Sequence, residues 1–192
     1  MDPLQAGTGT IRKLWPGESR KYRDHLLRLD EESRCRRFGG SVSDQHIRNH
    51  VEATKGFNAI VYGFFADGVL RGAAELQILY PRFVGREAEA AFSVETPWQS
   101  HGVGSALLER LLLAARNRGV KFLHIACVAD NKRMQQLARK FDAELSFSFG
   151  GVTGELEMPR PTPLSLMREW VDDSQGIAVA VLEAQARLLK SS

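Results

Sequence analysis

The sequence predicts an α/β (α+β) protein whose elements follow the order β-α-α-β-β-β-α-β-α-β-β. Three patterns lead to this prediction: an Asp67-Gly68 dipeptide between two apolar runs, a strictly alternating stretch at 87–95, and a broad apolar stripe of helical period at 102–118. An Asp-Gly pair supplies the positive φ angles of a tight hairpin, period two is typical of a strand, and spacings of three and four residues are typical of a helix.

Length and composition indicate a soluble globular protein with a single core. The chain has 192 residues, of which 43% are hydrophobic and 26% charged, and this is the ordinary balance for such a protein. Its 26 Lys and Arg against 23 Asp and Glu give an evenly spread net charge of +3. A charge this small does not favour nucleic acid as a partner.

Cysteine usage and the absence of long apolar runs predict a cytoplasmic protein. Cys35 and Cys127 lie in different segments without metal or redox spacing, so two reduced thiols are expected. Residues 1–10 lack a basic start followed by an apolar stretch, and nowhere do 18 apolar residues run together. We therefore expect no leader segment and no membrane span.

The first part of the chain is predicted to hold one strand and two helices. Polar and apolar residues alternate at 10–15, and the apolar residues of 19–37 recur at helical spacing. A second helix begins at Ser43 or Asp44, either of which can cap it, and stops at Gly56.

Three strands follow. The apolar, β-rich runs 58–66 and 69–79 flank the Asp67-Gly68 turn and form a hairpin. The alternating stretch 87–95 is the next strand, and it ends just before Pro97.

The second half of the chain is predicted to alternate between helices and strands. A helix at 102–118 ends in cationic residues and a glycine, and a buried strand at 121–128 and a helix at 131–141 follow it. Two more strands, at 144–149 and 151–158, meet at a glycine pair.

The last segment is predicted to be helical. After a Pro161-Thr162-Pro163 turn, the runs 164–171 and 177–189 have the pattern of two helices. We therefore divide the chain into a domain over 1–159 and a C-terminal helical tail over 160–192.

The loop Gln99-Ser100-His101-Gly102-Val103-Gly104-Ser105 lies between a strand and the long helix. The first N–H groups of a helix lack internal acceptors and the helix dipole is positive there, so a pyrophosphate can bind, and glycines let it come close. A Walker loop would need Gly-Lys-Ser/Thr, and a dinucleotide fingerprint would need a third glycine where Leu107 stands. A flexible helix start is the alternative interpretation.

With Gln99, Gly102 and Gly104, this loop matches the acyl-CoA-binding motif Gln/Arg-x-x-Gly-x-Gly/Ala and so resembles the GNAT superfamily of N-acetyltransferases. The order of elements over 10–158 also resembles the GNAT fold, a central mixed, mostly antiparallel sheet flanked by helices. The resemblance implies an acyltransferase that takes acetyl-CoA (coenzyme A) as acyl donor, uses no metal, and acetylates a primary amine.

A narrower similarity is to the GNAT domain of Pat-type protein lysine acetyltransferases. The segments that carry it are Leu29-Asp30-Glu31-Glu32-Ser33-Arg34 with Arg37-Phe38, Ala88-Glu89, and Asn131-Lys132-Arg133-Met134 with Leu137-Ala138. Many GNAT enzymes share parts of these segments.

The resemblance also implies the cofactor contacts. Main-chain groups of Phe92, Ser93 and Val94 are expected to pair with the pantetheine arm, which behaves like an added strand. The residues expected to bind the pyrophosphate are Gln99, Ser100, His101, Gly102, Val103, Gly104 and Ser105. Asn131 and Met134 are expected at the thioester end, with core packing as the alternative role of Met134. The Val94 amide is the expected donor to the transition-state oxyanion.

A catalytic base is needed because a lysine amine, with a pKa of about 10.4, is almost fully protonated at neutral pH. Glu89 occupies the position of the catalytic glutamate in Pat-like relatives and is expected to take the proton directly or through water. Glu95 is the second candidate for the catalytic base. A solvated strand face is the alternative interpretation of Glu87, Glu89 and Glu95.

The sequence does not identify the group that donates a proton to the departing thiolate. Many GNAT enzymes place a tyrosine on the helix after the fifth strand, but the matching position here is Ala138. Water can protonate a thiolate whose pKa is about 8.5, and Ser93 and Tyr80 are the side-chain candidates.

The acceptor is a protein lysine, which the Pat-like similarity favours, or a small-molecule amine. Arg34, Arg36 and Arg37 are candidates for binding an acidic acceptor or a cofactor phosphate, with a solvated helix end as the alternative. His46 and His50 are four residues apart on a helix, but Ile47 stands where a zinc protease carries glutamate, so we expect a surface pair and no metal site.

Two further hypotheses concern activity and assembly. The protein is a non-catalytic acyl-CoA-binding sensor or scaffold if the change at Ala138 has removed catalysis. The tail covers the acceptor cleft, or it packs on the same domain or on the second subunit of a homodimer, because its apolar residues need a surface to bury against.

Overall fold

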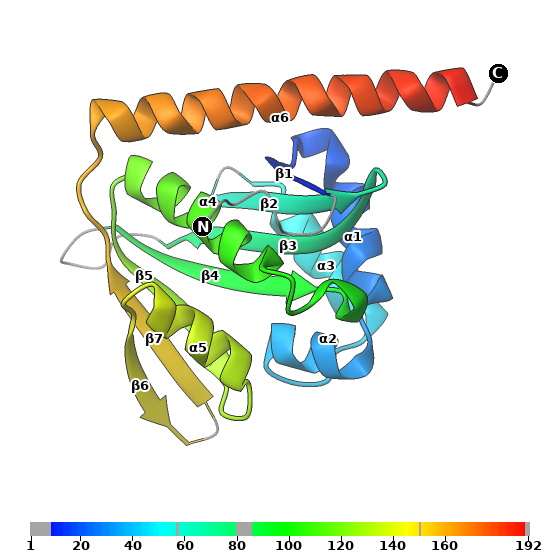
Figure 1. Ribbon diagram of the computed structural model, residues 1–192. Coiled ribbons are helices and arrows are strands. Elements are labelled where there is room, and N and C mark those ends of the chain that lie inside the picture. The colour runs from blue at the N-terminus through cyan, green and yellow to red at the C-terminus, as the bar shows by residue number, and fades with distance from the viewer. Residues whose placement is uncertain (1–8, 57, 80–85, 150, 191–192) are drawn as a thin grey trace.

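The computed structural model describes residues 9–56, 58–79, 86–149 and 151–190. Within these ranges seven strands form one sheet in the order β1-β2-β3-β4-β5-β7-β6 (Figure 1). The strands are β1 (Thr10–Lys13), β2 (Ala59–Ala66), β3 (Val69–Ile78), β4 (Arg86–Val94), β5 (Val120–Val128), β6 (Glu144–Ser148) and β7 (Gly151–Glu157). All neighbouring strands of this sheet are antiparallel except β4 and β5. The predicted fold class is confirmed.

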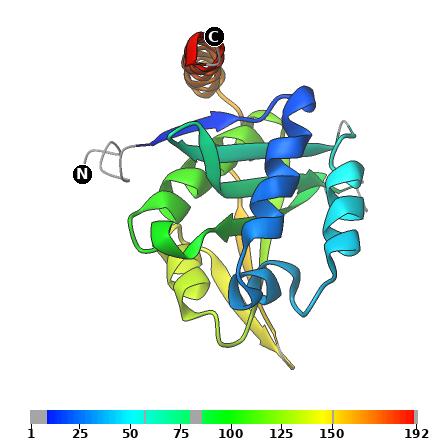
Figure 2. The ribbon, with the colours of Figure 1, turned by 90° about the vertical axis from the view of Figure 1, so that its right-hand side faces the viewer.

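Helices cover both faces of the sheet (Figures 1 and 2). They are α1 (Ser19–Arg28), α2 (Glu31–Phe38) and α3 (Asp44–Ala53) on one face, α4 (Val103–Asn117) and α5 (Lys132–Lys140) on the other, and α6 (Pro163–Lys190) along β1 and α4. Two short 3-10 turns, η2 (Pro16–Glu18) and η3 (Thr96–Trp98), precede α1 and the loop to α4. No helix in the described part of the chain has an apolar stretch long enough to cross a membrane.

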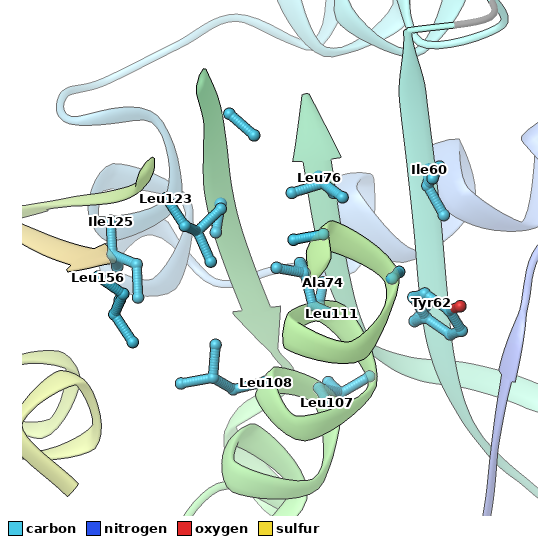
Figure 3. Close-up of a cluster of buried hydrophobic side chains, with 14 of the residues drawn as sticks. Ile60, Tyr62, Ala74, Leu76, Leu107, Leu108, Leu111, Leu123, Ile125 and Leu156 are labelled. Atoms are coloured by element: carbon cyan, nitrogen blue, oxygen red, sulfur yellow. The ribbon is translucent and has the colours of Figure 1, made fainter. Parts of the chain in front are cut away.

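The main core lies between the sheet and α4 (Figure 3). Leu107, Leu108 and Leu111 of α4 are completely buried, and they pack in one cluster with side chains such as Leu76 and Leu123 of the sheet. These leucines belong to the apolar stripe that predicts the helix, and their burial holds α4 across the sheet.

The predicted hairpin is present. Asp67 and Gly68 have φ angles of 51° and 70°, and Ala66 pairs with Val69 on either side of them. Positive φ at both central positions matches the twist of the two strands.

The helix predicted at 19–37 is two helices. The chain turns at Leu29, where ψ is 136°, and the Asp30 carboxylate then accepts a hydrogen bond from Ser33 N at 2.7 Å and caps α2. A capping aspartate at this position starts a new helix in another direction, although the apolar spacing runs on without a break.

The two helices predicted in the tail are one continuous helix, α6. Gly176, which lies between the two predicted helices, is buried against β1. A Cβ atom at this position would lie 2.9 Å from the Cβ of Arg12. The glycine therefore allows the helix to approach the strand closely, and this contact outweighs its low helix propensity of about 1 kcal/mol.

A buried ionic cluster fixes α1, α2 and α3 to β3. The Glu75 carboxylate accepts hydrogen bonds from Tyr22 at 2.6 Å, Arg37 at 2.6 Å and His50 at 2.8 Å. Burial alone raises the pKa of Glu75, but the bonds from His50 and Tyr22 and the charge of Arg37 hold this pKa below its ordinary value. His50 is thus part of this cluster and is not one of a surface pair.

We expect Glu75→Gln to lower the free energy of unfolding by about 3 kcal/mol, because the variant leaves the buried Arg37 charge without its counter-charge. Glu52→Gln is the matched control, since Glu52 is an exposed glutamate on α3 that pairs with Lys55, and a change below about 1 kcal/mol is expected there. Urea unfolding at neutral pH measures both. Equal stability of the two variants would contradict a structural role for the cluster.

Candidate functional site

β4 and β5 begin as parallel neighbours and then separate. Their pairing ends at Ala90 and Ile125, although both strands continue. β4 stays paired with β3 as far as Val94, and β5 with β7 as far as Val128. Beyond Ala90, therefore, each strand has one edge that no other strand of the described residues occupies, and the two edges border an opening in the sheet.

Strand alternation decides which main-chain groups face this opening. The Glu87 carbonyl and the Glu95 amide both bond to the β3 side, at 2.8 and 2.9 Å. Because successive residues direct their amide groups to opposite edges, Phe92 and Val94 present theirs to the opening and Ser93 presents its own to β3. Main-chain contacts from Phe92 and Val94 are available to an extended ligand, whereas the contact expected from Ser93 is not.

A groove, here named the β4–β5 groove, lies along the β4 side of the opening and runs to the start of α4. Residues from β4, α2, α5 and the loop before α4 line it. The predicted cofactor-binding residues on its walls are Phe92, Ser93, Val94, Gln99, Ser100, Gly104, Asn131 and Met134. His101 and Gly102 are exposed beside it, Val103 is buried in the core, and Ser105 lies in the first turn of α4.

The start of α4 presents unpaired amides at the end of the groove. Ala106 N donates to the Gly102 carbonyl at 3.0 Å, so the amides of 103–105 have no acceptor within the helix. Ser100 and Gly102 turn the chain with φ angles of 63° and 81°. The positive end of the helix dipole adds to these donors, and an anion such as a phosphate can bind there.

Cationic side chains surround this helix start. Arg133 donates to Gln99 Oε1 at 2.6 Å, and Lys140 Nζ donates to Ser105 Oγ at 3.3 Å. Arg36 of α2 also lines the groove. Of the three arginines considered from the sequence, Arg36 lies in the groove, while Arg37 binds Glu75. The groove end is therefore suited to a polyphosphate.

The Gln99 side chain bridges the groove. Its Nε2 donates to the Val94 carbonyl at 2.9 Å and to Ser33 Oγ at 3.2 Å, and Arg133 holds its Oε1. Gln99 thus occupies the Val94 carbonyl that an extended ligand would use, so such a ligand has to displace it.

The three glutamates of the predicted strand differ in their partners. Glu87 pairs with His124 at 3.2 Å. Glu95 is buried and accepts hydrogen bonds from Arg28 and Arg71 at 3.0 and 2.9 Å. Glu89 is exposed and makes no ion pair or side-chain hydrogen bond with any described residue.

These differences separate the candidate bases. Burial alone raises the pKa of Glu95, but the bonds from His25 and Arg71 and the charge of Arg28 lower the pKa to about 2, so this carboxylate is a poor proton acceptor. Glu89 is free, but it does not line the groove. Strand geometry puts it about 10 Å from Phe92, on the side of the groove away from α4.

Sequence patterns did not identify His25, which lies behind the groove wall. The ring of His25 is completely buried, with Nε2 3.0 Å from Ser93 Oγ and Nδ1 3.1 Å from Glu95. Because the Glu95 carboxylate only accepts hydrogen bonds, Nδ1 carries a proton. Burial lowers the pKa of His25 and favours the neutral ring, in which Nε2 accepts the hydrogen bond from the Ser93 hydroxyl. The sequence offers one signal for this role: a histidine stands among the apolar residues on the buried face of α1.

α5 lines the groove with the residues that are expected near the thioester. Asn131 Oδ1 accepts from Met134 N at 3.1 Å and caps the helix, and Met134 packs partly on the main core. Ala138, where many GNAT enzymes carry a tyrosine, is buried against β7 and does not line the groove. Ser93 directs its hydroxyl proton to His25, and Tyr80 lies outside the described residues.

A second hollow opens beside the groove, between α2 and the end of β5. We name it the acidic hollow, because its rim carries the carboxylates of Glu31, Glu32 and Asp130. Cys35 and Arg36 also line it, and Arg36 is shared with the β4–β5 groove. The two cavities therefore adjoin on either side of one arginine.

Comparison with known proteins identifies the family. A family model described as the acetyltransferase (GNAT) family matches residues 25–143, a stretch that includes both walls of the groove and the start of α4. The chain belongs to the GNAT acetyltransferase family. The resemblance read from Gln99, Gly102 and Gly104 is confirmed.

The Pat-type similarity is also confirmed. The chain is 26% identical over 194 residues to the acetyltransferase Pat of Mycolicibacterium smegmatis, covering 95% of this chain and 56% of that protein. It thus spans little more than half the length of this GNAT relative.

Solved structures show the same fold. The GNAT domain of S. lividans PAT superposes with a TM-score of 0.68 at 22% identity, over 79% of this chain and 92% of that one. A putative acetyltransferase from Salmonella typhimurium, described with its cofactor acetyl-CoA, gives a TM-score of 0.58 at 18% identity over 81% and 97% of the two chains.

We expect the His25 ring to stay neutral as the pH falls through 6.5, its ordinary pKa, because burial lowers the pKa of this imidazole. Since the unfolded chain then binds a proton that the folded chain does not, His25 makes the protein less stable as the pH falls below about 6.5. Nitrogen-15 NMR of the imidazole measures the pKa and the tautomer. A midpoint at or above 6.5, or a proton on Nε2, would contradict the arrangement.

Proposed function

We propose that this chain is an acetyl-CoA-dependent N-acetyltransferase, with its acetyltransferase domain over residues 1–159. The separation of β4 from β5, with the amides of α4 at its end, is the observation that carries the proposal. It offers an unpaired strand edge and an anion site in one continuous groove.

Both parts of the groove fit coenzyme A. The pantetheine arm contains amide groups, which match the main-chain groups that Phe92 and Val94 direct into the opening, as an added strand would. The pyrophosphate matches the amides of 103–105, with Arg133 and Lys140 near by. Gln99 releases the Val94 carbonyl when the arm binds.

In the proposed reaction the thioester of acetyl-CoA supplies the acyl group, and the residues orient the acceptor amine and remove its proton. The Val94 amide faces the opening and is the proposed donor to the carbonyl oxygen as negative charge develops. Glu89 accepts the amine proton through water, because strand geometry keeps it about 10 Å from Phe92. Water returns a proton to the departing thiolate.

The acidic hollow is the proposed entry for the acceptor. Glu32 pairs with Arg36, and the carboxylates of Glu31 and Asp130 favour a cation. A lysine side chain or another alkylammonium carries that charge. The hollow adjoins the groove at Arg36, so an amine that enters there approaches the thioester end. The open rim and the similarity to Pat support a protein lysine over a small amine.

We expect Gly104→Glu to weaken acetyl-CoA binding by about 100-fold or more, because a carboxylate in the first turn of α4 repels the pyrophosphate. Gly17→Glu is the matched control: it places the same side chain where a Cβ atom meets open space, far from the groove. Calorimetry with acetyl-CoA measures both. Equal affinity in the two variants would contradict the proposal that the pyrophosphate binds at the start of α4.

We expect Glu89→Gln to reduce turnover by about 100-fold or more while acetyl-CoA binding is retained, because the amide cannot accept the amine proton. Glu87→Gln, two residues away on the same face, should keep near-normal turnover. Thiol release with a panel of lysine peptides and small amines measures the rates. Unchanged turnover of Glu89→Gln removes Glu89 from the mechanism.

The same panel separates the remaining alternatives. Turnover with small amines and none with peptides would show a small-molecule acetyltransferase. Acetyl-CoA binding without turnover on any amine would show a non-catalytic acyl-CoA-binding module, the function that the alanine at position 138 allows.

A further inference from the structure

α6 has an apolar outer face that no described part of the chain covers. Seven of the eleven exposed large hydrophobic side chains found among the described residues lie on this one helix. They are Leu164, Leu166, Met167, Trp170, Val171, Ile177 and Val181. Trp170 is 71% exposed and Met167 is 57% exposed. A continuous patch of this kind is uncommon on a monomer surface and marks a contact with a partner.

The opposite face of α6 packs on the rest of the chain. Ser165 and Glu169 bond to Asn117 at 2.6 and 2.7 Å, and Asp172 pairs with Arg110. Gly176 packs on β1. With 3.6 residues per turn, these four positions share one side of the helix, and Ser174 points the opposite way. Figure 2 shows α6 end-on at the edge of the molecule, with its outer side facing away from the sheet.

The apolar residues of the outer face are arranged symmetrically about Ser174. Val171 and Ile177 lie three residues before and after it, Trp170 and Ala178 four, and Met167 and Val181 seven. Three of the five members that precede Ser174 thus have apolar counterparts at the same distances beyond it. These spacings of three, four and seven keep all six side chains within about 60° of the Ser174 direction.

We propose that α6 forms a homodimer by packing antiparallel against α6 of a second copy, with the two-fold axis beside Ser174. In such a pair Val171 lies level with Ile177 of the partner subunit, and Met167 lies level with Val181 of the partner subunit. Trp170 lies level with Ala178 of the partner subunit, so the largest side chain meets a small one. Ser174 meets its own copy, and its small size lets the helices approach closely.

The pattern favours a second copy over an unrelated partner. An interface between identical chains related by a two-fold axis has to be self-complementary, and the outer face of α6 has this property along its sequence. The helix is about 42 Å long, and its side-chain bonds to the body within the described residues come from its first half. Antiparallel packing lays the second half of each helix beside the anchored first half of the other.

The oligomeric state of the full chain tests this proposal directly. Light scattering coupled to size exclusion should give twice the chain mass of 21.4 kDa. Val171→Lys should weaken the dimer by about 100-fold or more, because two lysines enter its apolar centre. Phe147→Lys is the matched control, since Phe147 is 65% exposed on β6 and far from α6. A monomeric wild type, or a Val171→Lys variant as dimeric as the control, overturns the proposal.

A cross-link tests the position of the axis. In a chain with Cys35 and Cys127 replaced by serine, Ser174→Cys should form a disulfide-linked dimer on mild oxidation. Gln175→Cys, which points about 100° away from the interface, should link much less. Equal linking at both positions, or none at Ser174→Cys, overturns the antiparallel arrangement about Ser174.

Discussion

The separation of β4 from β5 is the constraint on which the rest of the site depends. These strands form the parallel pair of an otherwise antiparallel sheet, and each keeps its antiparallel neighbour after Ala90 and Ile125. Backbone groups without a strand partner need another partner or water. In this chain the Gln99 side chain takes the Val94 carbonyl, so the edge is satisfied locally and stays available to a ligand that displaces Gln99.

Two ionic clusters, each centred on a buried glutamate, support this open wall from the opposite face of the sheet. One joins Glu95 to Arg28, Arg71 and His25, and so fastens the free end of β4 to α1. The other joins Glu75 to the three N-terminal helices. Buried charges are stable only when they are fully paired, so both clusters favour a single position of α1 and α2. That position fixes the groove wall and the acidic hollow together.

α4 links the two surfaces proposed for function. Its first turn lies at the end of the β4–β5 groove. Its last residue, Asn117, and the following Arg118 both bond to α6. A helix of this length separates the two ends by about 22 Å. In the proposed dimer, a second copy on α6 therefore leaves the groove and the acidic hollow open. The buried leucines of α4 pack this helix against the sheet (Figure 3).

Local patterns in the sequence were sufficient for the strands, the hairpin, α4 and the glycine-containing loop before it, because period, turn residues and helix starts are set by neighbouring residues. The resemblance of Gln99, Gly102 and Gly104 to a known motif indicated the GNAT family. Local patterns did not predict that Asp30 caps a new helix and so divides the predicted one. They also did not predict that α6 continues through Gly176, which packs on β1. The partners of the glutamates could likewise not be predicted without the tertiary structure. Glu89 and Glu95 occupy equivalent places in the alternation of β4. Glu89 nevertheless has no side-chain partner among the described residues, whereas Glu95 lies between two arginines and His25. Distant segments bring these side chains together, and only the tertiary structure decided which carboxylate is available to accept a proton.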